Sequence, residues 1–188
     1  GAQGQDACPM QPGTSWQNGI IGCPDSDGDG WWDVQDAFPT EPSQWSDVDG
    51  DGYGDNSSGV NADACPNIGG NSTVDRLGCI DTDGDGRSDA ELSWTIFDGA
   101  DDPLFRLEPT QWRDTDNDGY GDEIDGFQGD QCPDVYGLSS NDRFGCPDSD
   151  GDGWSDPDAN WTLEDGADAY INDPLTHIYV EPIEPKES

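Results

Sequence analysis

Hydrophobic and polar positions along the chain follow no sustained helical period. Its 26 glycines and 14 prolines recur every few positions, so they interrupt regular segments. Residues 89–94 are compatible with a helical turn or two, and the alternation of Ile178, Val180 and Ile183 predicts a short strand. No apolar run approaches the length of a transmembrane helix. The pattern therefore predicts turns and short β-strands, and no membrane insertion.

The apolar content is too low for an ordinary hydrophobic core. Leu, Ile, Val and Phe number 27 of 188 residues, or 14%, which together with high net charge is typical of disordered chains. Eight Trp, five Tyr and six Cys argue for an ordered chain, because a solvated tail has no use for such residues. We therefore expect an irregular fold with a minimal hydrophobic core, held together by something other than apolar burial.

The charge is strongly negative. Asp and Glu number 43 against six Lys and Arg, which gives a net charge of −37. Nucleic acid and anionic membrane surfaces are excluded as partners, because both carry the same sign of charge. Catalysis is not indicated either: His177 is the single histidine, no nucleophile motif or phosphate loop occurs, and 43 acids bring carboxylate pairs together by chance. We therefore predict that the chain is not an enzyme.

The six cysteines form three pairs at matched spacing. Each pair encloses a loop rich in Gly, Ser and Asn, and six cysteines allow 15 connectivities. The nearly equal spacing within the pairs favours local disulfides, Cys8 with Cys23, Cys65 with Cys79, and Cys132 with Cys146. Each would stabilise the fold by roughly 3 kcal/mol. Reduced thiols or a cysteine metal site are the alternatives, but no CxxC spacing or nearby His accompanies the pairs. We expect an oxidising compartment.

A longer repeat runs through the chain. The second cysteine of each pair, at Cys23, Cys79 and Cys146, marks the same point of successive copies, and the second interval is the longer one. The stretch "TEPSQWSD" (40–47) recurs as "LEPTQWRD" (107–114), while the third copy, "NDPLTHIY" (172–179), has His177 at the tryptophan position. We therefore divide the chain into repeat 1 (1–62), repeat 2 (63–129), a partial repeat 3 (130–177) and a C-terminal tail (178–188).

Five aspartate clusters recur, two in each full repeat and one in the partial repeat. They read "DSDGDGWWD" (25–33), "DVDGDGYGD" (47–55), "DTDGDGRSD" (81–89), "DTDNDGYGD" (114–122) and "DSDGDGWSD" (148–156). Carboxylates this close repel one another unless a divalent cation lies between them. Calcium is the best candidate because it prefers oxygen and accepts six to eight ligands, whereas magnesium resists losing water and zinc or copper would want His and Cys.

Each cluster matches the front of an EF-hand loop, with Asp at positions 1, 3, 5 and 9 and Gly at position 6. The predicted carboxylate ligands are Asp25, Asp27, Asp29, Asp33, Asp47, Asp49, Asp51, Asp55, Asp81, Asp83, Asp85, Asp89, Asp114, Asp116, Asp118, Asp122, Asp148, Asp150, Asp152 and Asp156. Position 7 should supply a backbone carbonyl, from Trp31, Tyr53, Arg87, Tyr120 and Trp154. A solvated acidic surface or a flexible tail is the alternative, and fivefold recurrence with a fixed glycine argues against it.

Position 12 departs from the EF-hand, because none of the five clusters has the bidentate Glu there. More distant acids must then complete the shell. The candidates recur in register, before a cysteine or in a short "GAD" or similar context: Asp36, Asp63, Asp98, Asp101, Asp130, Asp165 and Asp168. Five calcium ions would change the net charge from −37 to −27 and ten to −17, so we expect more than five.

The combination of DxDxDGxxD with a following DxCP resembles the thrombospondin type 3 repeat, which occurs in microbial and animal extracellular proteins. The resemblance covers about residues 6–174 and is carried best by "DGDGYGDNSSGVNADACPN" (49–67). It implies an elongated, calcium- and disulfide-stapled tandem repeat with the Asp clusters and the Asp before each Cys as ligands. That family usually links the cysteines of successive repeats, whereas the pairs of this chain look local.

Three sequons, at Asn56, Asn71 and Asn160, fit an extracellular glycoprotein, and chance in a chain rich in Asn, Ser and Thr is the alternative. The start at Gly1 without Met fits a mature secreted form, and a piece of a longer surface protein would look the same. Four tryptophans at repeat-defined positions are expected to cover calcium loops, with a sugar-binding platform as the alternative: Trp31, Trp45, Trp112 and Trp154.

We expect an extracellular or cell-surface calcium-binding structural protein, either a rigid stalk or a fibre subunit. The spacing at the two ends favours head-to-tail self-association, because the interval from His177 through the end of the chain to Asp6 of a next subunit nearly equals that from Trp45 to Asp63. The tail would then add an edge strand to its neighbour. The alternative is a calcium-dependent adhesion or glycan-binding module of a larger surface protein.

Overall fold

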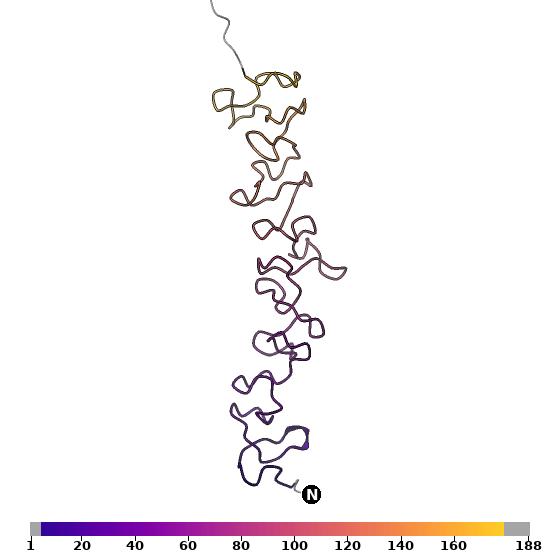
Figure 1. Ribbon diagram of the computed structural model, residues 1–188, viewed down its shortest axis with the longest axis vertical. Helices are drawn as coiled ribbons and strands as arrows, with labels where there is room; N and C mark the ends of the chain where they lie inside the picture. Colours follow the sequence, from indigo (N-terminus) through magenta and orange to yellow (C-terminus); the bar gives the residue numbers. More distant parts are fainter. Residues whose placement is uncertain (1–4, 179–188) are drawn as a thin grey trace, which may run out of the picture. The chain divides into compact units, whose positions relative to one another are not determined.

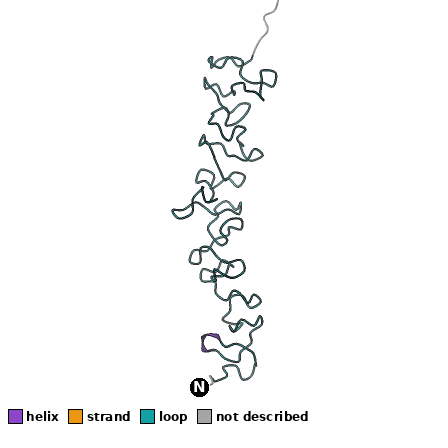
Figure 2. Ribbon diagram, turned by 180° about the vertical axis from the view of Figure 1, so that it is seen from behind, coloured by secondary structure: helices purple, strands orange, loops and turns teal. Residues whose placement is uncertain are grey.

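A computed structural model describes residues 5–178, and these form turns and loops with almost no regular secondary structure (Figures 1 and 2). One 3-10 helix is present among them, η1 (Gln17–Gly19), drawn in purple in Figure 2. Isolated bridges join Gly54 to Ala62 and Glu91 to Trp94. The prediction of little regular structure is confirmed.

Two local predictions have other outcomes. At 89–94, where the sequence allows at most a helical turn or two, the chain forms a tight turn in which Glu91 and Trp94 exchange two backbone hydrogen bonds of 2.8 and 3.2 Å. The expected short strands are not formed in the described part of the chain, where pairing stops at single bridges. The strand proposed for the C-terminal tail falls almost wholly outside the described residues.

The chain divides into two compact units, Gly1–Ala100 and Asp101–Ser188. Within each unit, hydrogen bonds join segments close in sequence, such as the Ala64 amide with the Leu77 carbonyl at 2.9 Å in the first. The corresponding bond in the second unit runs from the Gln131 amide to the Phe144 carbonyl, also at 2.9 Å. Local bonding of this kind lets each loop be built largely from its own sequence.

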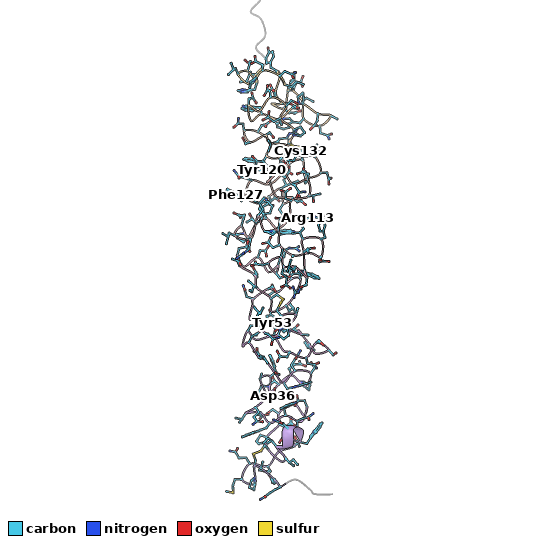
Figure 3. The ribbon with its side chains drawn as sticks, turned by 90° about the vertical axis from the view of Figure 1, so that its right-hand side faces the viewer. Asp36, Tyr53, Arg113, Tyr120, Phe127 and Cys132 are labelled. Atoms are coloured by element: carbon cyan, nitrogen blue, oxygen red, sulfur yellow. A yellow bond between two sulfur atoms is a disulfide. The ribbon has the colours of Figure 1, made fainter. Side chains whose placement is uncertain are left out.

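The interior of each unit is mostly polar. The buried apolar residues are Cys23, Cys79, Ala100, Phe105, Cys146 and Ala167. Serine, glutamine and aspartate side chains fill most of the remaining buried positions, while residues as apolar as Leu92 and Phe97 are exposed. Side chains project from loops all along the chain, with Asp36 and Cys132 among those labelled in Figure 3. Apolar burial therefore contributes little, as the composition predicts.

All six cysteines are bonded, in the local pairs that the spacing favours: Cys8–Cys23, Cys65–Cys79 and Cys132–Cys146. A fully buried serine supports each second cysteine by accepting a hydrogen bond from its amide, as Ser139 does for Cys146 at 3.1 Å. The serine hydroxyl donates in turn to a loop carbonyl, that of Arg143 in this copy. Ser15 and Ser72 repeat the arrangement. The loop is thus closed covalently and its interior polar groups are satisfied.

A buried glutamine organises the segment that follows each "EPxQW" stretch. Gln111 is fully buried and its amide donates to the carbonyls of Glu123 at 2.8 Å and Phe127 at 3.2 Å. Its oxygen accepts from the Glu123 amide at 3.0 Å. Gln44, at the equivalent position of the first repeat, makes the same three bonds to the corresponding residues. A single neutral side chain therefore closes each loop by backbone hydrogen bonds.

Candidate metal centres

Each aspartate cluster is a loop in which the carboxylates are held by backbone amides. In 114–122, one Asp114 oxygen accepts from the Asn117 amide at 2.6 Å and the other from the Gly119 amide at 2.9 Å. Asp116 accepts from the Asp118 amide at 3.2 Å, and Asp118 from the Tyr120 amide at 2.9 Å. The position-6 glycine has φ of +100°, a left-handed conformation that any side chain would strain. The sequence spacing alone therefore sets this loop geometry.

The other four clusters repeat these bonds, and their position-6 glycines all have φ between +92° and +100°. In every cluster the carboxylates of positions 1, 3 and 5 offer oxygen atoms that lie within 4.8 Å of one another. The five groups are Asp25, Asp27 and Asp29; Asp47, Asp49 and Asp51; Asp81, Asp83 and Asp85; Asp114, Asp116 and Asp118; and Asp148, Asp150 and Asp152. Three like charges at such distances repel strongly.

The second oxygen of many of these carboxylates is buried and receives no hydrogen bond. This holds for Asp27, Asp29, Asp49, Asp83, Asp85, Asp116 and Asp150, in each case the Oδ2 atom. Buried carboxylate oxygens without a partner are costly, and native proteins satisfy them by a donor or an ion. Because these atoms belong to the third and fifth positions of the clusters, the unsatisfied oxygens coincide with the predicted ligands.

The position-9 aspartates close the loops from the other side. Asp122 accepts from the amide of Thr115 at 2.9 Å and from its hydroxyl at 2.6 Å. Ser26, Thr82 and Ser149 bind their position-9 aspartates in the same way, and Asp55 accepts from Ser46 and Val48. Each carboxylate oxygen has further lone pairs, so this role in the loop is compatible with a bound cation.

A distant aspartate faces four of the clusters, as the register of the sequence predicts. Asp130 is fully buried, accepts from the Cys132 amide at 2.7 Å through Oδ1, and has no hydrogen bond to Oδ2. Burial raises the pKa of Asp130 to about 7, opposed by the Cys132 amide and assisted by the charges of Asp118, Asp116 and Asp122. The fourth cluster thus has a buried carboxylate beside it.

Asp36, Asp63 and Asp168 repeat the pattern beside the first, second and fifth clusters. Each accepts from the amide two residues later, and burial raises the pKa of each, with further increases from the carboxylates of positions 3, 5 and 9 of its cluster. The Oδ2 atoms of Asp63 and Asp168 are also buried without a hydrogen bond. Asp101 is buried as well, with 2% of its surface exposed.

Two further predicted ligands are hydrogen-bonded within their own turns. Asp98 and Asp165 are exposed, and each accepts bonds from the amide and hydroxyl of the threonine three residues earlier, Thr95 and Thr162. These bonds lower the pKa of both carboxyls. Each carboxylate is therefore held in its own turn through Oδ2, and its role as a ligand stays a prediction.

The second and fourth clusters are tied to the disulfide loop that follows them. The Oδ2 atom of Asp51 accepts from the Gly70 amide at 3.0 Å, and that of Asp118 from the Gly137 amide at 3.1 Å. The position-5 carboxylates of the first and third clusters, Asp29 and Asp85, have a buried Oδ2 without a hydrogen bond. The second and fourth clusters therefore differ from the first and third in how the position-5 carboxylate is bonded.

Aromatic rings lie beside several clusters, as expected for the repeat-defined tryptophans. Trp31 stacks on Trp45 with centroids 6.3 Å apart and planes inclined by 8°. Trp154 stacks on His177 at 4.2 Å and 5°, so His177 occupies the place of a tryptophan in the degenerate third copy. Stacking itself was not predicted from the sequence, and the covering of calcium loops by these tryptophans stays a prediction.

A second set of contacts surrounds Arg76 and Arg143, which the sequence predicts to pair locally with Asp; Arg143 does so with Asp158, whereas Arg76 pairs with Glu91. Asp75 accepts from the amide and hydroxyl of Ser88, at 2.8 and 2.7 Å, and from the Trp94 indole at 3.1 Å. Arg76 lies over the same ring, 5.5 Å from its centroid, and pairs with Glu91 at 2.6 Å. The arrangement recurs one repeat later in Asp142, Arg143, Ser155, Asp158 and Trp161. In the sequence, these contacts could have been inferred from the recurrence of "DR" and a following "W" at equivalent positions of the two repeats.

The three sequons differ in their surroundings. Asn71 and Asn160 are exposed. Asn56 is half-buried, and its side-chain amide donates to the Ser43 carbonyl at 2.8 Å. Because a glycan must project into solvent, the exposed Asn71 and Asn160 are favoured over the half-buried Asn56 as acceptors.

Comparison with protein-family models, curated proteins and solved structures gave no match. Among the described residues, no helix is long and apolar enough to cross a membrane. The three disulfides are compatible with an extracellular protein.

Proposed function

We propose that the protein is an extracellular calcium-binding structural protein whose fold depends on the bound ions. The observation that carries this proposal is the set of buried Oδ2 atoms without hydrogen bonds, which belong to aspartates of the clusters and to the distant aspartates facing them. A cation at each cluster would satisfy these atoms and neutralise the repulsion within the cluster.

The donor set favours calcium over other divalent cations. Each candidate site offers carboxylate oxygens at positions 1, 3 and 5, with the position-7 carbonyl and a distant aspartate to complete it. All six cysteines are in disulfides, so no thiolate is left for zinc. Six to eight oxygen ligands in flexible geometry suit calcium. Five such sites account for five ions, and the residual charge of −27 supports additional ones.

The mechanical part of the proposal is a tandem repeat that serves as a stalk or fibre subunit. Hydrogen bonds that recur at equivalent positions of successive copies, around Gln44 and Gln111 and around Asp75 and Asp142, support the repeat. The resemblance to the thrombospondin type 3 repeat supports the same architecture. Head-to-tail self-association is the further step, and secretion and glycosylation at Asn71 and Asn160 accompany it.

The test is a calcium titration of chelated protein by calorimetry, with circular dichroism and light scattering on the same sample. We expect five or more ions to bind together with an increase in near-ultraviolet signal from the ordered tryptophans. Magnesium at the same concentration is the control and should order the chain much less. Binding without ordering contradicts ion-dependent folding, and ordering without growth in particle size contradicts the fibre.

A further inference from the structure

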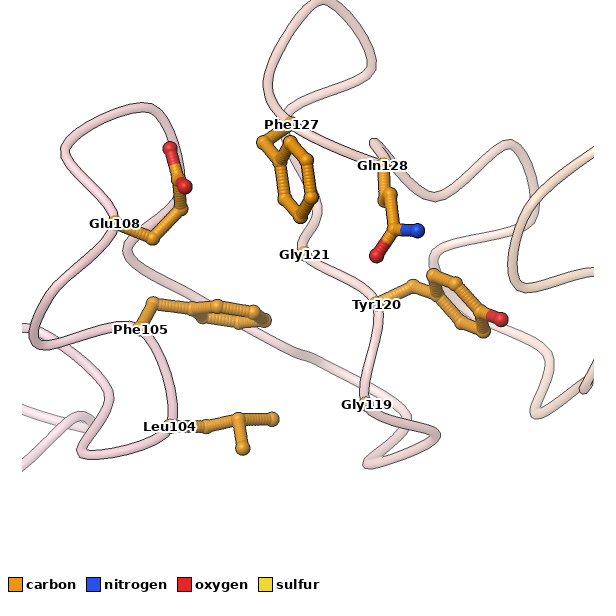
Figure 4. Close-up of a pocket in the computed structure, with 8 residues that line it drawn as sticks. All are labelled: Leu104, Phe105, Glu108, Gly119, Tyr120, Gly121, Phe127 and Gln128. Atoms are coloured by element: carbon orange, nitrogen blue, oxygen red, sulfur yellow. The ribbon is translucent and has the colours of Figure 1, made fainter. Parts of the chain in front are cut away.

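An aromatic pocket in the second unit lies beside, but outside, the cluster 114–122 carboxylates. It has a volume of about 240 Å³ and is lined by Leu104, Phe105, Glu108, Gly119, Tyr120, Gly121, Phe127 and Gln128 (Figure 4). In Figure 4 the rings of Phe105 and Phe127 face the space in front of Gly121 from two sides, whereas the Tyr120 ring points away from that space and packs on Phe144, with centroids 5.6 Å apart. This volume is below the range of about 300–1,000 Å³ that is usual for drug-sized ligands, so the pocket suits a single side chain.

The charge around the pocket selects the kind of side chain. Glu108 is the charged residue of the lining, and its Oε1 atom is fixed by the amide and hydroxyl of Thr110 at 3.4 and 2.6 Å. Asp118 and Asp122, on either side of Tyr120 in the sequence, are predicted calcium ligands, so Glu108 is the charge of the lining that remains in the calcium-loaded chain, whose net charge with five ions is −27. Aromatic faces attract cations through their quadrupole, and a nearby carboxylate adds to that attraction. An anionic or purely apolar partner would lack this complementarity.

We propose that this pocket binds a lysine or arginine side chain projecting from a basic protein partner. The rings of Phe105 and Phe127 would hold the apolar stem and the cationic head, with Glu108 at the rim. Gly119, Tyr120 and Gly121 are positions 6 to 8 of the fourth cluster. Ordering of that cluster therefore also sets the pocket, and binding should require the calcium-ordered chain. This last step rests on the proposed function.

The first unit provides a matched comparison. Phe38, Glu41, Tyr53 and Gly54 stand at the positions of Phe105, Glu108, Tyr120 and Gly121, and Asn61 and Gln128 both have φ of +49°. Val60 replaces Phe127 in this frame and Ala37 replaces Leu104. The equivalent segment of the first unit thus keeps the backbone conformation and the glutamate but lacks the ring of Phe127. The variant Phe127→Val therefore introduces the residue that the first unit has at the equivalent position.

The experiment uses the full chain in saturating calcium and a pentapeptide with one arginine between glycines, capped at both ends. The peptide with citrulline in place of arginine, which has the same shape and no charge, is the control. Binding is followed by NMR shifts of the aromatic side chains at millimolar peptide. We expect shifts centred on Phe105, Tyr120 and Phe127, and much smaller shifts with the citrulline peptide.

Two variants separate the pocket from general attraction to an acidic chain. Phe127→Val changes no charge, and we expect binding to weaken about five-fold or more. Glu108→Gln keeps the Oε1 acceptor for Thr110 and should weaken binding by a similar factor. The double variant Ala37→Leu, Val60→Phe builds the missing wall in the first unit, and we expect a second set of shifts there.

Equal binding of the arginine and citrulline peptides overturns the proposal, as does unchanged affinity in Phe127→Val that still binds calcium normally. If the arginine peptide binds with shifts spread over exposed acids, the attraction is a general charge effect and the pocket is not its site. Calcium stoichiometry is measured on the same samples. Failure of the peptide to bind an ordered, calcium-loaded chain therefore overturns the pocket and leaves the proposed calcium-dependent fold intact.

Discussion

Asp116→Asn should change stability in opposite directions with and without calcium. Asp116 is the central carboxylate of its cluster, with oxygens within 4.8 Å of those of Asp114 and Asp118. Asparagine retains an oxygen acceptor for the Asp118 amide, so the loop bond at 3.2 Å is kept. The substitution therefore removes charge with little change in shape.

The magnitude follows from Coulomb's law. Two unit charges 4.8 Å apart repel by about 0.9 kcal/mol at the dielectric constant of water and about 3.5 kcal/mol at an effective value near 20. The substitution removes two of the three pairs, so it stabilises the calcium-free fold by about 2 to 7 kcal/mol. In calcium the same change removes a charged ligand, and affinity at that site should fall at least about ten-fold.

The assay is urea unfolding followed by tryptophan fluorescence, in chelator and in saturating calcium, with calorimetry for ion number. An osmolyte added equally to all samples brings the calcium-free transition into range. Asp125→Asn is the matched control, because Asp125 is exposed and the change removes the same unit of charge from the same unit of the chain. If both variants behave alike in both conditions, repulsion within the cluster and ligation by Asp116 are both refuted.

Four further substitutions probe the surroundings of the clusters. The pKa of Asp130 is about 7 in the calcium-free fold and about 3.9 in the unfolded chain. Between these two pH values the folded chain binds more protons than the unfolded chain, so the free energy of unfolding should fall as pH rises through this range. Calcium displaces that proton, so its affinity should rise from pH 5.5 to 7.5, and calorimetry should show this dependence flattened in Asp130→Asn. Gln111→Ala removes three hydrogen bonds to the backbone of Glu123 and Phe127 and empties a fully buried position, so it should lower the free energy of unfolding in calcium by about 2 to 4 kcal/mol, measured by urea titration. Gly145→Ala and Gly151→Ala both strain a backbone of positive φ, +72° and +81°. A Cβ at 145 would also lie 2.2 Å from Asp130 Oδ1, whereas one at 151 meets nothing within 4 Å. The first should therefore weaken calcium binding at the fourth cluster much more than the second, and equal effects would contradict the placement of Asp130.

The clusters could be predicted from sequence because each is a closed local unit. The bonds of 114–122 join residues two to seven positions apart, and the alternation of Asp with Gly specifies which amide meets which carboxylate. The distant aspartates were accessible by register, and the structure brings Asp36, Asp63, Asp130 and Asp168 to their clusters. The sequence register alone did not distinguish these four aspartates from Asp98 and Asp165. A carboxylate can accept hydrogen bonds from its own turn as readily as it can bind an ion.

The buried glutamines could not be inferred in the same way. A neutral amide carries no charge pattern, and Gln44 and Gln111 stand in sequences where the neighbouring tryptophan gives the stronger signal. Their role depends on carbonyls far along the chain, whose direction no local spacing specifies. The tight turn at 89–94 has a related cause, since the cross-turn bonds of Glu91 with Trp94 override local helix propensity.

Because the interior is polar, the free energy of ion binding contributes directly to the free energy of folding. The most completely buried side chains are Gln44, Gln111, Asp130, Asp168 and several serines and cysteines, so little apolar area is available to offset the conformational entropy of ordering these loops. The bonds from Gly70 to Asp51 and from Gly137 to Asp118 connect a cluster to the next disulfide loop. An ion that fixes Asp51 or Asp118 therefore also positions that loop, including the fully buried serine behind its second cysteine. The first and third clusters lack this bond at their position-5 Oδ2, so their ions should order mainly their own loops. Calcium should thus act in two classes of site, with the second and fourth clusters carrying order along the chain.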